Sequence, residues 1–367
     1  MLYWIEDIDE KILESEAGQV FVEKLGMASK EGKICLFGKT TCLDTIASHD
    51  SLSSIARSSF TFALSNYAEL GGRYSKVKRQ VRVFITNSDI YKKNETEDSI
   101  IIECDYLKIP TDFNNPVTLL AENHKDAYFY ELIAKNTNPY RNLGLDIKLT
   151  TTGGGGATIT DHMNHYYRNK SVVFICIVDS DLKHPSSAQG DTAKQAKKSF
   201  DENNFFSDLF ILDVHEAENI IPDTVINDIF FRKNDAKIEA IDIYTELCEI
   251  EHSAAAYIDL KNGISAIEAL SIDKKHNKNY WTGMLSKLKR IPNCCRKTLS
   301  ENEERCECFI FEGFGDKILE HSLSNLQSRN VAPVIGQMSD WKQGLWTDIG
   351  SWIAGWACCP KQGARRC

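Results

Sequence analysis

Val172–Val178 is an unbroken run of seven apolar residues, and two aspartates, Asp179 and Asp181, follow it closely. Such a run is typical of a strand buried on both faces, as in a parallel sheet covered by helices. Ligands of open α/β sheets bind beyond the carboxyl ends of the strands, so both aspartates are predicted to lie at a functional site. Because side chains alternate along extended backbone, the pair is expected on one side of the strand, where it could share a hard cation.

A second acidic turn follows the predicted strand Val117–Leu120. This turn contains Glu122, and a helix is predicted to begin near Asp126, which gives the strand-turn-helix order of half a βαβ unit. Asp126 is expected either to bind a metal or to cap the helix N-terminus, and the sequence favours neither role. A third acidic segment, with Glu216 and Glu218, lies further along the chain.

Four consecutive glycines follow a predicted strand at Asp146–Leu149. Gly153 and Gly154 allow the backbone to approach a phosphate group closely, and they equally allow a tight turn. His124 and His215 lie beside the acidic turns and could assist proton transfer, but a lone histidine is more often a hydrogen-bonding neighbour. The glycine turn therefore leaves both phosphate binding and chain reversal open.

In this order, the acidic motifs resemble the Toprim domain, the metal-dependent catalytic module of topoisomerases, DnaG-type primases and OLD-family nucleases. The resemblance covers residues 116–223 and is closest to the Toprim-like proteins of bacterial anti-phage systems. Asn123 stands where that family has glycine, and asparagine is the non-glycine residue that best adopts a left-handed turn. The resemblance implies a Rossmann-like parallel core and catalytic acids at Glu122, Asp179 and Asp181. It also implies Mg²⁺, with Mn²⁺ able to substitute, held by Glu122, Asp126, Asp179, Asp181, Glu216 and Glu218.

The same resemblance implies a Mg²⁺-dependent nuclease that cleaves DNA or RNA as the toxic effector of an abortive-infection system. A topoisomerase would need large strand-passing domains, and a primase would need a zinc-binding and helicase-contacting apparatus. No complete phosphate loop occurs in the sequence, so an ATPase that controls the effector is expected to be a separate partner protein. The chain could also form a homo-oligomer.

Two other functions and one structural alternative remain open. The chain could be a catalytically inactive Toprim fold that binds nucleic acid or a partner protein. It could instead be a nucleotide-binding α/β domain that uses the glycine turn for a phosphate. In the simplest alternative, the acidic residues are solvated carboxylates on the loops of an ordinary α/β domain.

The length of 367 residues is sufficient for two or three domains. With 42% hydrophobic and 26% charged residues, the composition is that of a globular protein, and no apolar stretch approaches the ~20 residues that span a bilayer. The acidic start at Glu6–Glu10 does not fit a targeting peptide, so a cytoplasmic location and no membrane partner are expected. The formal charge of −9 argues against a broad basic face that coats DNA.

Three regions are predicted along the chain. Residues 1–115 are expected to form a mixed or β-rich domain, residues 116–223 the Toprim-like catalytic domain, and residues 224–367 a helical domain with a cysteine- and tryptophan-rich end. In the first region we predict a helix over 5–25 and short strands at 33–37, 59–64, 80–85 and 99–104. Tryptophans near the end of the chain are expected mainly in the core.

Seven of the twelve cysteines follow residue 293. Without a secretion signal, reduced thiols or a zinc site are favoured over disulfides. No Cys-x-x-Cys pair is present, although zinc sites commonly use that spacing. We expect that Zn²⁺, if bound, would be held by Cys294 or Cys295 with Cys306, Cys308 and Cys358 or Cys359; the set we favour is Cys294, Cys306, Cys308 and Cys358.

Overall fold

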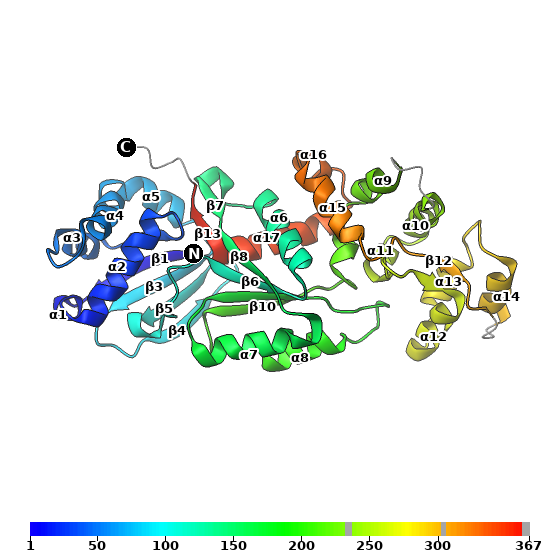
Figure 1. Cartoon of the computed structure of the whole chain (residues 1–367), viewed down its shortest axis with the longest axis horizontal. Coiled ribbons are helices and arrows are strands. Elements are labelled where there is room, and N and C mark those ends of the chain that lie inside the picture. The colour runs from blue at the N-terminus through cyan, green and yellow to red at the C-terminus, as the bar shows by residue number, and fades with distance from the viewer. Residues whose placement is uncertain (232–236, 302–305, 362–367) are drawn as a thin grey trace.

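The computed structural model describes residues 1–231, 237–301 and 306–361 of the chain. Figure 1 shows an elongated molecule with a sheet at the N-terminal end, a second sheet in the middle and a helical region at the other end. The N-terminus lies where the N-terminal sheet meets the second sheet, and β13 (Cys358–Pro360) lies beside it.

The N-terminal region is an α/β unit built on a five-stranded sheet with the order β2-β1-β3-β5-β4. Strands β1, β2, β3 and β5 run parallel to one another, and β4 is an antiparallel edge strand. The strands are β1 (Leu2–Ile8), β2 (Cys35–Gly38), β3 (Arg79–Ile85), β4 (Tyr91–Glu95) and β5 (Ile100–Asp105). The helices are α1 (Glu10–Leu13), α2 (Glu16–Lys30), α3 (Thr40–Ser48), α4 (Ser54–Ser65) and α5 (Tyr67–Tyr74). The short 3₁₀ helix η1 (Tyr106–Lys108) follows β5.

Two predicted elements of this region are wrong. The segment 59–64 belongs to helix α4, because Ser53 caps the helix by accepting from the Ala56 N–H at 3.1 Å and the buried residues Ala56, Phe60 and Ala63 recur at helical spacing. The predicted helix over 5–25 begins too early, since its first residues belong to β1. That strand is central, paired on both sides, and its residues Leu2, Tyr3 and Ile5 are buried.

The second sheet consists of four parallel strands in the order β10-β9-β6-β8. Its strands are β6 (Val117–Ala121), β8 (Leu149–Gly153), β9 (Phe174–Val178) and β10 (Ser207–Ile211). Strand β9 is buried along its whole length, as the apolar run predicts. The expected α/β class with a parallel core is therefore confirmed, while the Toprim assignment stays a prediction.

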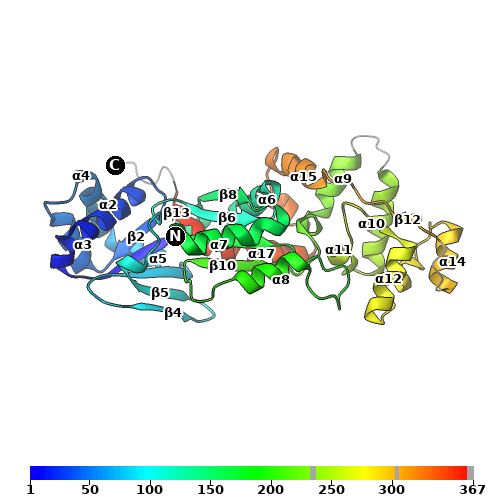
Figure 2. The same cartoon turned by 60° about the horizontal axis from the view of Figure 1, so that its bottom comes forward.

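Helices cover both faces of this sheet (Figures 1 and 2). Alternate residues of β9 separate the two layers: Phe174, Cys176 and Val178 pack with α7 (Ile159–Asn169) and α8 (Asp191–Ser199). Ile175 and Ile177 belong to the main core, which includes α6 (His124–Asn136). The short 3₁₀ helices η2 (Arg141–Leu143) and η3 (Gly156–Thr158) lie in the connections.

After the second sheet the chain is mainly helical, and its last helix returns to the middle of the molecule. Helix α17 (Asp340–Ala357) packs on α6, and β13 (Cys358–Pro360) pairs with β7 (Leu145–Ile147). The Met1 ammonium group donates to the Cys358 carbonyl at 2.6 Å. Trp346 and Trp356 are fully buried on α17, which confirms the predicted core role of these tryptophans. The predicted boundaries at 115/116 and 223/224 stay predictions.

The remaining elements form the end of the molecule farthest from the N-terminal sheet in Figure 1, together with helices beside the second sheet. They are η4 (Ala217–Ile220), α9 (Asp223–Phe231), α10 (Ile238–Ile250), α11 (Ala254–Tyr257), β11 (Ile264–Ser265), α12 (Ala266–His276), α13 (Tyr280–Leu285), α14 (Asn293–Glu301), β12 (Phe309–Phe311), α15 (Ile318–Gln327) and α16 (Ala332–Ile335).

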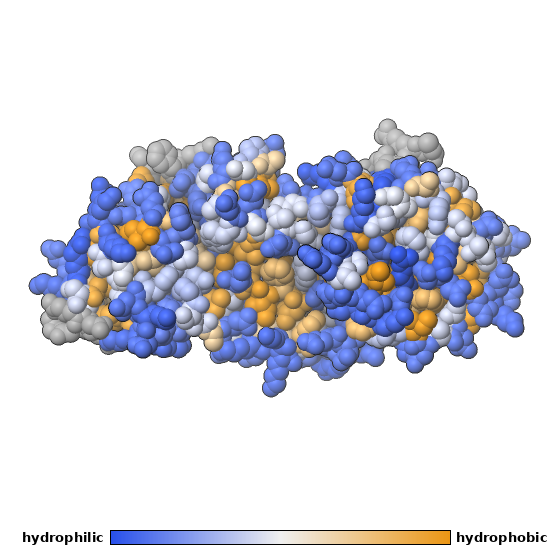
Figure 3. Space-filling view, turned by 180° about the vertical axis from the view of Figure 1, so that it is seen from behind, coloured by the Kyte–Doolittle hydropathy of each residue, from blue (hydrophilic) through white to orange (hydrophobic). Residues whose placement is uncertain are grey.

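The surface is hydrophilic over most of the face in Figure 3, with an apolar patch near the middle. Within residues 1–231, 237–301 and 306–361, no helix combines the length and apolar character that a membrane span requires.

Candidate metal centre

The acidic turns predicted from the sequence lie at one edge of the second sheet. Glu122 follows β6 directly, and Asp179 follows β9 directly. Strand β10 runs on through Leu212 into the turn that carries Glu216 and the 3₁₀ helix with Glu218. Because β6, β9 and β10 are parallel neighbours, their carboxyl ends meet and bring these three segments together.

Glu122 and Asp179 are in direct contact. The Asp179 backbone N–H donates to Glu122 Oε1 at 3.2 Å, and the Tyr130 hydroxyl donates to Asp179 Oδ1 at 3.4 Å. Burial, with added repulsion from Asp181 and other nearby carboxylates, raises the pKa of Glu122 to about 7. The pKa of the buried Asp179 carboxyl rises well above its usual range, also mainly through burial.

Asp126 caps helix α6, so the capping role is confirmed. Its Oδ2 accepts from the Asn123 backbone N–H at 3.2 Å and from Asn123 Nδ2 at 2.6 Å, while the Asn123 side chain accepts from the first N–H groups of the helix. Asn123 has an extended backbone with φ of −139°, so the expected left-handed turn is wrong. Burial raises the pKa of Asp126 to about 6, although the bonds from Asn123 oppose this rise.

Asp181 adopts a left-handed backbone conformation with φ of +55°. The other non-glycine residues with positive φ in the described ranges, Lys170 and Asn277, are both helix C-caps, whereas Asp181 lies in a loop. The prediction that Asp179 and Asp181 project to one side of an extended strand is therefore wrong, because the backbone is no longer extended at Asp181. Its N–H donates to the His215 carbonyl at 3.0 Å, which ties the β9 loop to the loop after β10. Aspartate is one of the few non-glycine residues that adopt this region readily, so the conformation by itself implies little strain.

Asp181, His215 and Glu216 each place one possible ligand atom within 4.8 Å of the other two. His215 is 2% exposed, and its Nε2 lies 3.3 Å from Glu216 Oε1 and 3.8 Å from Asp259 Oδ2. Neither Nδ1 nor Nε2 of this ring has a hydrogen-bond partner in the part of the chain that the structure describes. The Asp181 side chain is exposed, so this side of the centre is open to solvent. The other histidine considered, His124, is exposed at the start of α6 and stacks on Tyr128.

Lys261 is the cation that contacts the acidic centre. Its Nζ lies 2.5 Å from Glu216 Oε2 and 3.6 Å from Glu218 Oε2. Burial lowers the pKa of Lys261, but Glu218 and Glu216 more than offset this effect and raise it overall. Burial raises the pKa of Glu218 to about 7, with Lys261 opposing the rise. Lys261 was not predicted as a site residue, since it lies in a turn about forty residues after the acidic segment and no sequence spacing connects the two.

The glycine turn packs against the turn that carries Glu122. The Gly154 N–H donates to the Ala121 carbonyl at 2.7 Å, and the N–H groups of Gly155 and Gly156 donate to the Glu122 carbonyl at 2.8 and 3.1 Å. A Cβ on Gly153 would lie 2.7 Å from the His124 backbone nitrogen. These bonds occupy the donors that a phosphate would need, so the structure favours the tight turn.

Four of the late cysteines gather in the helical region: Cys294, Cys295, Cys306 and Cys308. Their four Sγ atoms all lie within 4.8 Å of one another, so this group could also hold a metal ion. Cys358 belongs to β13, where its carbonyl meets the chain N-terminus, and its place in the predicted zinc set is wrong. The error arose because α17 carries the end of the chain back to the middle of the molecule. Cys295 takes the fourth position.

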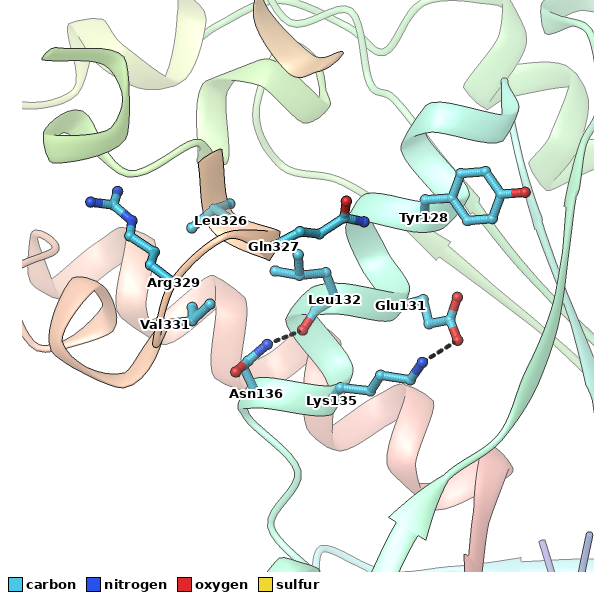
Figure 4. Close-up of a pocket in the computed structure, with 9 residues that line it drawn as sticks. All are labelled: Tyr128, Glu131, Leu132, Lys135, Asn136, Leu326, Gln327, Arg329 and Val331. Atoms are coloured by element: carbon cyan, nitrogen blue, oxygen red, sulfur yellow. Dashed lines mark hydrogen bonds and ion pairs between the residues drawn. The ribbon is translucent and has the colours of Figure 1, made fainter. Parts of the chain in front are cut away.

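A pocket between α6 and the segment after α15 is separate from the acidic centre (Figure 4). Its charged residues Glu131 and Lys135 pair with each other at 2.7 Å, and Asn136 Nδ2 donates to the Leu132 carbonyl at 2.9 Å. None of the predicted catalytic acids lines it.

Comparison of the chain with protein-family models, with curated proteins and with solved structures gave no match. Its function therefore has to be argued from the acidic centre itself.

Proposed function

We propose that this chain is a Mg²⁺-dependent nuclease that hydrolyses phosphodiester bonds in DNA or RNA at the acidic centre. The observation that carries the proposal is that Glu122, Asp179, Asp181 and Glu216 follow three adjoining strands at one sheet edge, where Asp181, His215 and Glu216 are close enough to share an ion. The negative charges of the four acids repel one another, and Lys261 offsets them only in part. Burying like charges together is costly unless a cation binds them.

The donor set fits a hard divalent cation. Carboxylate oxygens are the ligands that Mg²⁺ and Mn²⁺ favour. Asp181 and Glu216 would hold the ion together with His215, because their ligand atoms lie within 4.8 Å of one another. Glu122 and Asp179 lie outside that group and would complete the ligand set from the neighbouring strand ends, with Glu218 beside them, while Asp126 is engaged in its capping bonds. When bound, the ion supplies Lewis-acid activation of water and charge stabilisation at the phosphate. The exposure of the Asp181 side chain supports a role for this residue at the open side of the centre.

The residues around these acids would position the groups that react. The Nε2 atom of His215 lies near both Glu216 and Asp259, so a protonated ring would draw these two carboxylates together. Lys261 would place a positive charge where the phosphate enters, and Tyr130 would orient Asp179 through its hydroxyl. These contacts keep the acids in place before substrate arrives, which is the main requirement for electrostatic catalysis.

The biological part of the proposal rests on the resemblance alone. In that part, the chain acts in the cytoplasm as the toxic effector of an anti-phage system, under the control of a separate ATPase partner. No specific observation favours an inactive Toprim-like module. A nucleotide-binding domain is not favoured either, since the N–H groups of Gly154, Gly155 and Gly156 already donate to backbone carbonyls and are not free for a phosphate.

The test is cleavage of plasmid DNA and of total RNA by the purified full chain with Mg²⁺, with Mn²⁺ and with a chelator. We expect metal-dependent cleavage of at least one substrate and its loss in Asp179→Asn. The matched control is Glu131→Gln on α6, a carboxylate outside the centre that pairs with Lys135. Cleavage that survives in Asp179→Asn, or that is lost equally in Glu131→Gln, would refute the proposal.

A further inference from the structure

A second group of side chains that could hold a metal ion lies outside the acidic centre, at α14 and the segment before β12. Cys294 and Cys295 occupy the first turn of α14, and Cys306 and Cys308 precede β12. Figure 1 places both elements at the end of the molecule away from the N-terminal sheet. Nothing in the proposed nuclease reaction requires them.

The sulfur separations match the edges of a tetrahedral site. Cys295 Sγ lies 3.5 Å from Cys306 Sγ, and Cys294 Sγ lies 4.0 Å from Cys308 Sγ. A tetrahedron with Zn–S bonds of about 2.3 Å has sulfur-to-sulfur edges of about 3.8 Å. Two disulfides would instead require each pair of sulfurs to close to about 2.0 Å.

The surroundings of the sulfurs also suit a structural metal. Cys295 and Cys306 are buried, while Cys294 and Cys308 lie on the exposed side of the group. The Cys308 backbone N–H points at Cys306 Sγ at 3.4 Å, which is the kind of N–H to sulfur bond that stabilises a thiolate ligand. Four thiolates leave no position for water, and closed sites of this kind hold their metal for structure.

We infer that Cys294, Cys295, Cys306 and Cys308 form a tetrahedral structural Zn²⁺ site that fastens helix α14 to strand β12. Soft thiolate ligands in tetrahedral geometry select zinc over the hard cations that suit the acidic centre. The chain therefore holds two metal sites of opposite ligand chemistry, and this second site does not depend on the proposed nuclease activity.

The zinc site would also stabilise the turn that carries Lys261. Strand β12 pairs with β11, which begins three residues after Lys261. Beyond β12, the Phe314 N–H donates to the Leu260 carbonyl at 2.7 Å and the Gly315 N–H to the Lys261 carbonyl at 3.0 Å. A continuous set of backbone contacts thus connects the cysteine group to the cation at the acidic centre.

The test is the zinc content of the full chain, expressed and purified under reducing conditions without added chelator and measured by elemental mass spectrometry. We expect one zinc ion per chain in the wild type and in Cys248→Ser, a cysteine of α10 outside the group. Cys295→Ser and Cys306→Ser are expected to lose it. As a measurement that needs no variant, a thiol reagent added to the wild type should release the zinc in step with the modification of four cysteines.

Wild-type protein without zinc, even after incubation with Zn²⁺, would overturn the inference. So would iron in place of zinc, or intact-protein mass spectrometry that shows two disulfides among these four residues. Equal zinc loss in Cys248→Ser and Cys295→Ser would likewise contradict it, because the metal would then not be held by this group.

Discussion

Replacing Glu122 by glutamine is expected to make the metal-free chain more stable and inactive at the same time. Glutamine keeps the shape of the side chain and an oxygen that accepts from the Asp179 N–H. It removes one negative charge from a buried group of carboxylates. Most substitutions destabilise proteins, so a gain in stability at this position is a specific signature of a site built for a cation.

The magnitude follows from the pKa of Glu122. A carboxyl whose pKa rises from 4.5 to about 7 is harder to ionise in the folded chain than in the unfolded chain by about 3 kcal/mol. Partial exposure of the side chain screens part of this cost, so we expect Glu122→Gln to gain roughly 1 to 3 kcal/mol at pH 8. At pH 4.5 and below, where the wild-type carboxyl is protonated, the gain should vanish.

The assay is thermal unfolding of wild type, Glu122→Gln and the control Glu131→Gln, in chelator and in Mg²⁺. Mg²⁺ at 100 times its dissociation constant should add about 2.7 kcal/mol to the free energy of unfolding of the wild type and so raise its unfolding midpoint. It should raise that of Glu122→Gln much less. A variant that is less stable than wild type at pH 8 in chelator, or that gains as much from Mg²⁺, would refute the reasoning.

Three further predictions concern the same centre. In chelator, wild-type stability should fall as pH rises from about 5 to 8. The pKa values of Glu122, Asp126 and Glu218 are raised in the folded chain, so these carboxyls stabilise the fold fully below their unfolded-state pKa values and lose this effect as the pH passes through about 6 to 7. A thermal unfolding midpoint that rises between pH 5 and 8 would disagree with this prediction. Lys261→Met should cost roughly 1 to 3 kcal/mol in chelator, because Glu216 and Glu218 lose their counter-ion, and Mg²⁺ should recover more of this loss than it adds to the wild type. The exposed Lys194→Met should change stability by less than about 0.5 kcal/mol in the same unfolding assay. Gly153→Ala should lower stability by about 1 to 3 kcal/mol and reduce cleavage, since its Cβ would press on the turn after Glu122. Gly283→Ala, which meets nothing within 4 Å, should be neutral or stabilising, and equal effects of the two substitutions would contradict this packing argument.

The parallel core was predictable from the sequence because buried strands have a strong local signal. The apolar run that forms β9 and the acidic residues that follow β6 and β9 identify strand ends, and parallel pairing then brings those ends together. The capping role of Asp126 was one of two roles that its position allowed.

Features that depend on distant contacts were not predictable. The left-handed backbone at Asp181 follows from its bond to the His215 carbonyl, which only the folded chain creates. Lys261 reaches the centre through a turn held by the segment after β12. Cys358 was assigned to the wrong group because nothing in its local sequence shows that α17 returns to α6. At α4, Ser and Phe residues favoured a strand locally, although the helical spacing of the buried residues was present.

The most direct test of the metal centre is the location of Mn²⁺ by anomalous diffraction from crystals of the full chain soaked in that ion. The structure predicts a peak within coordination distance of Glu122, Asp179 or Asp181 together with Glu216, and no peak there in Glu122→Gln crystals. Absence of a peak at this edge of the sheet in the wild type, at Mn²⁺ concentrations that support cleavage, would contradict the account.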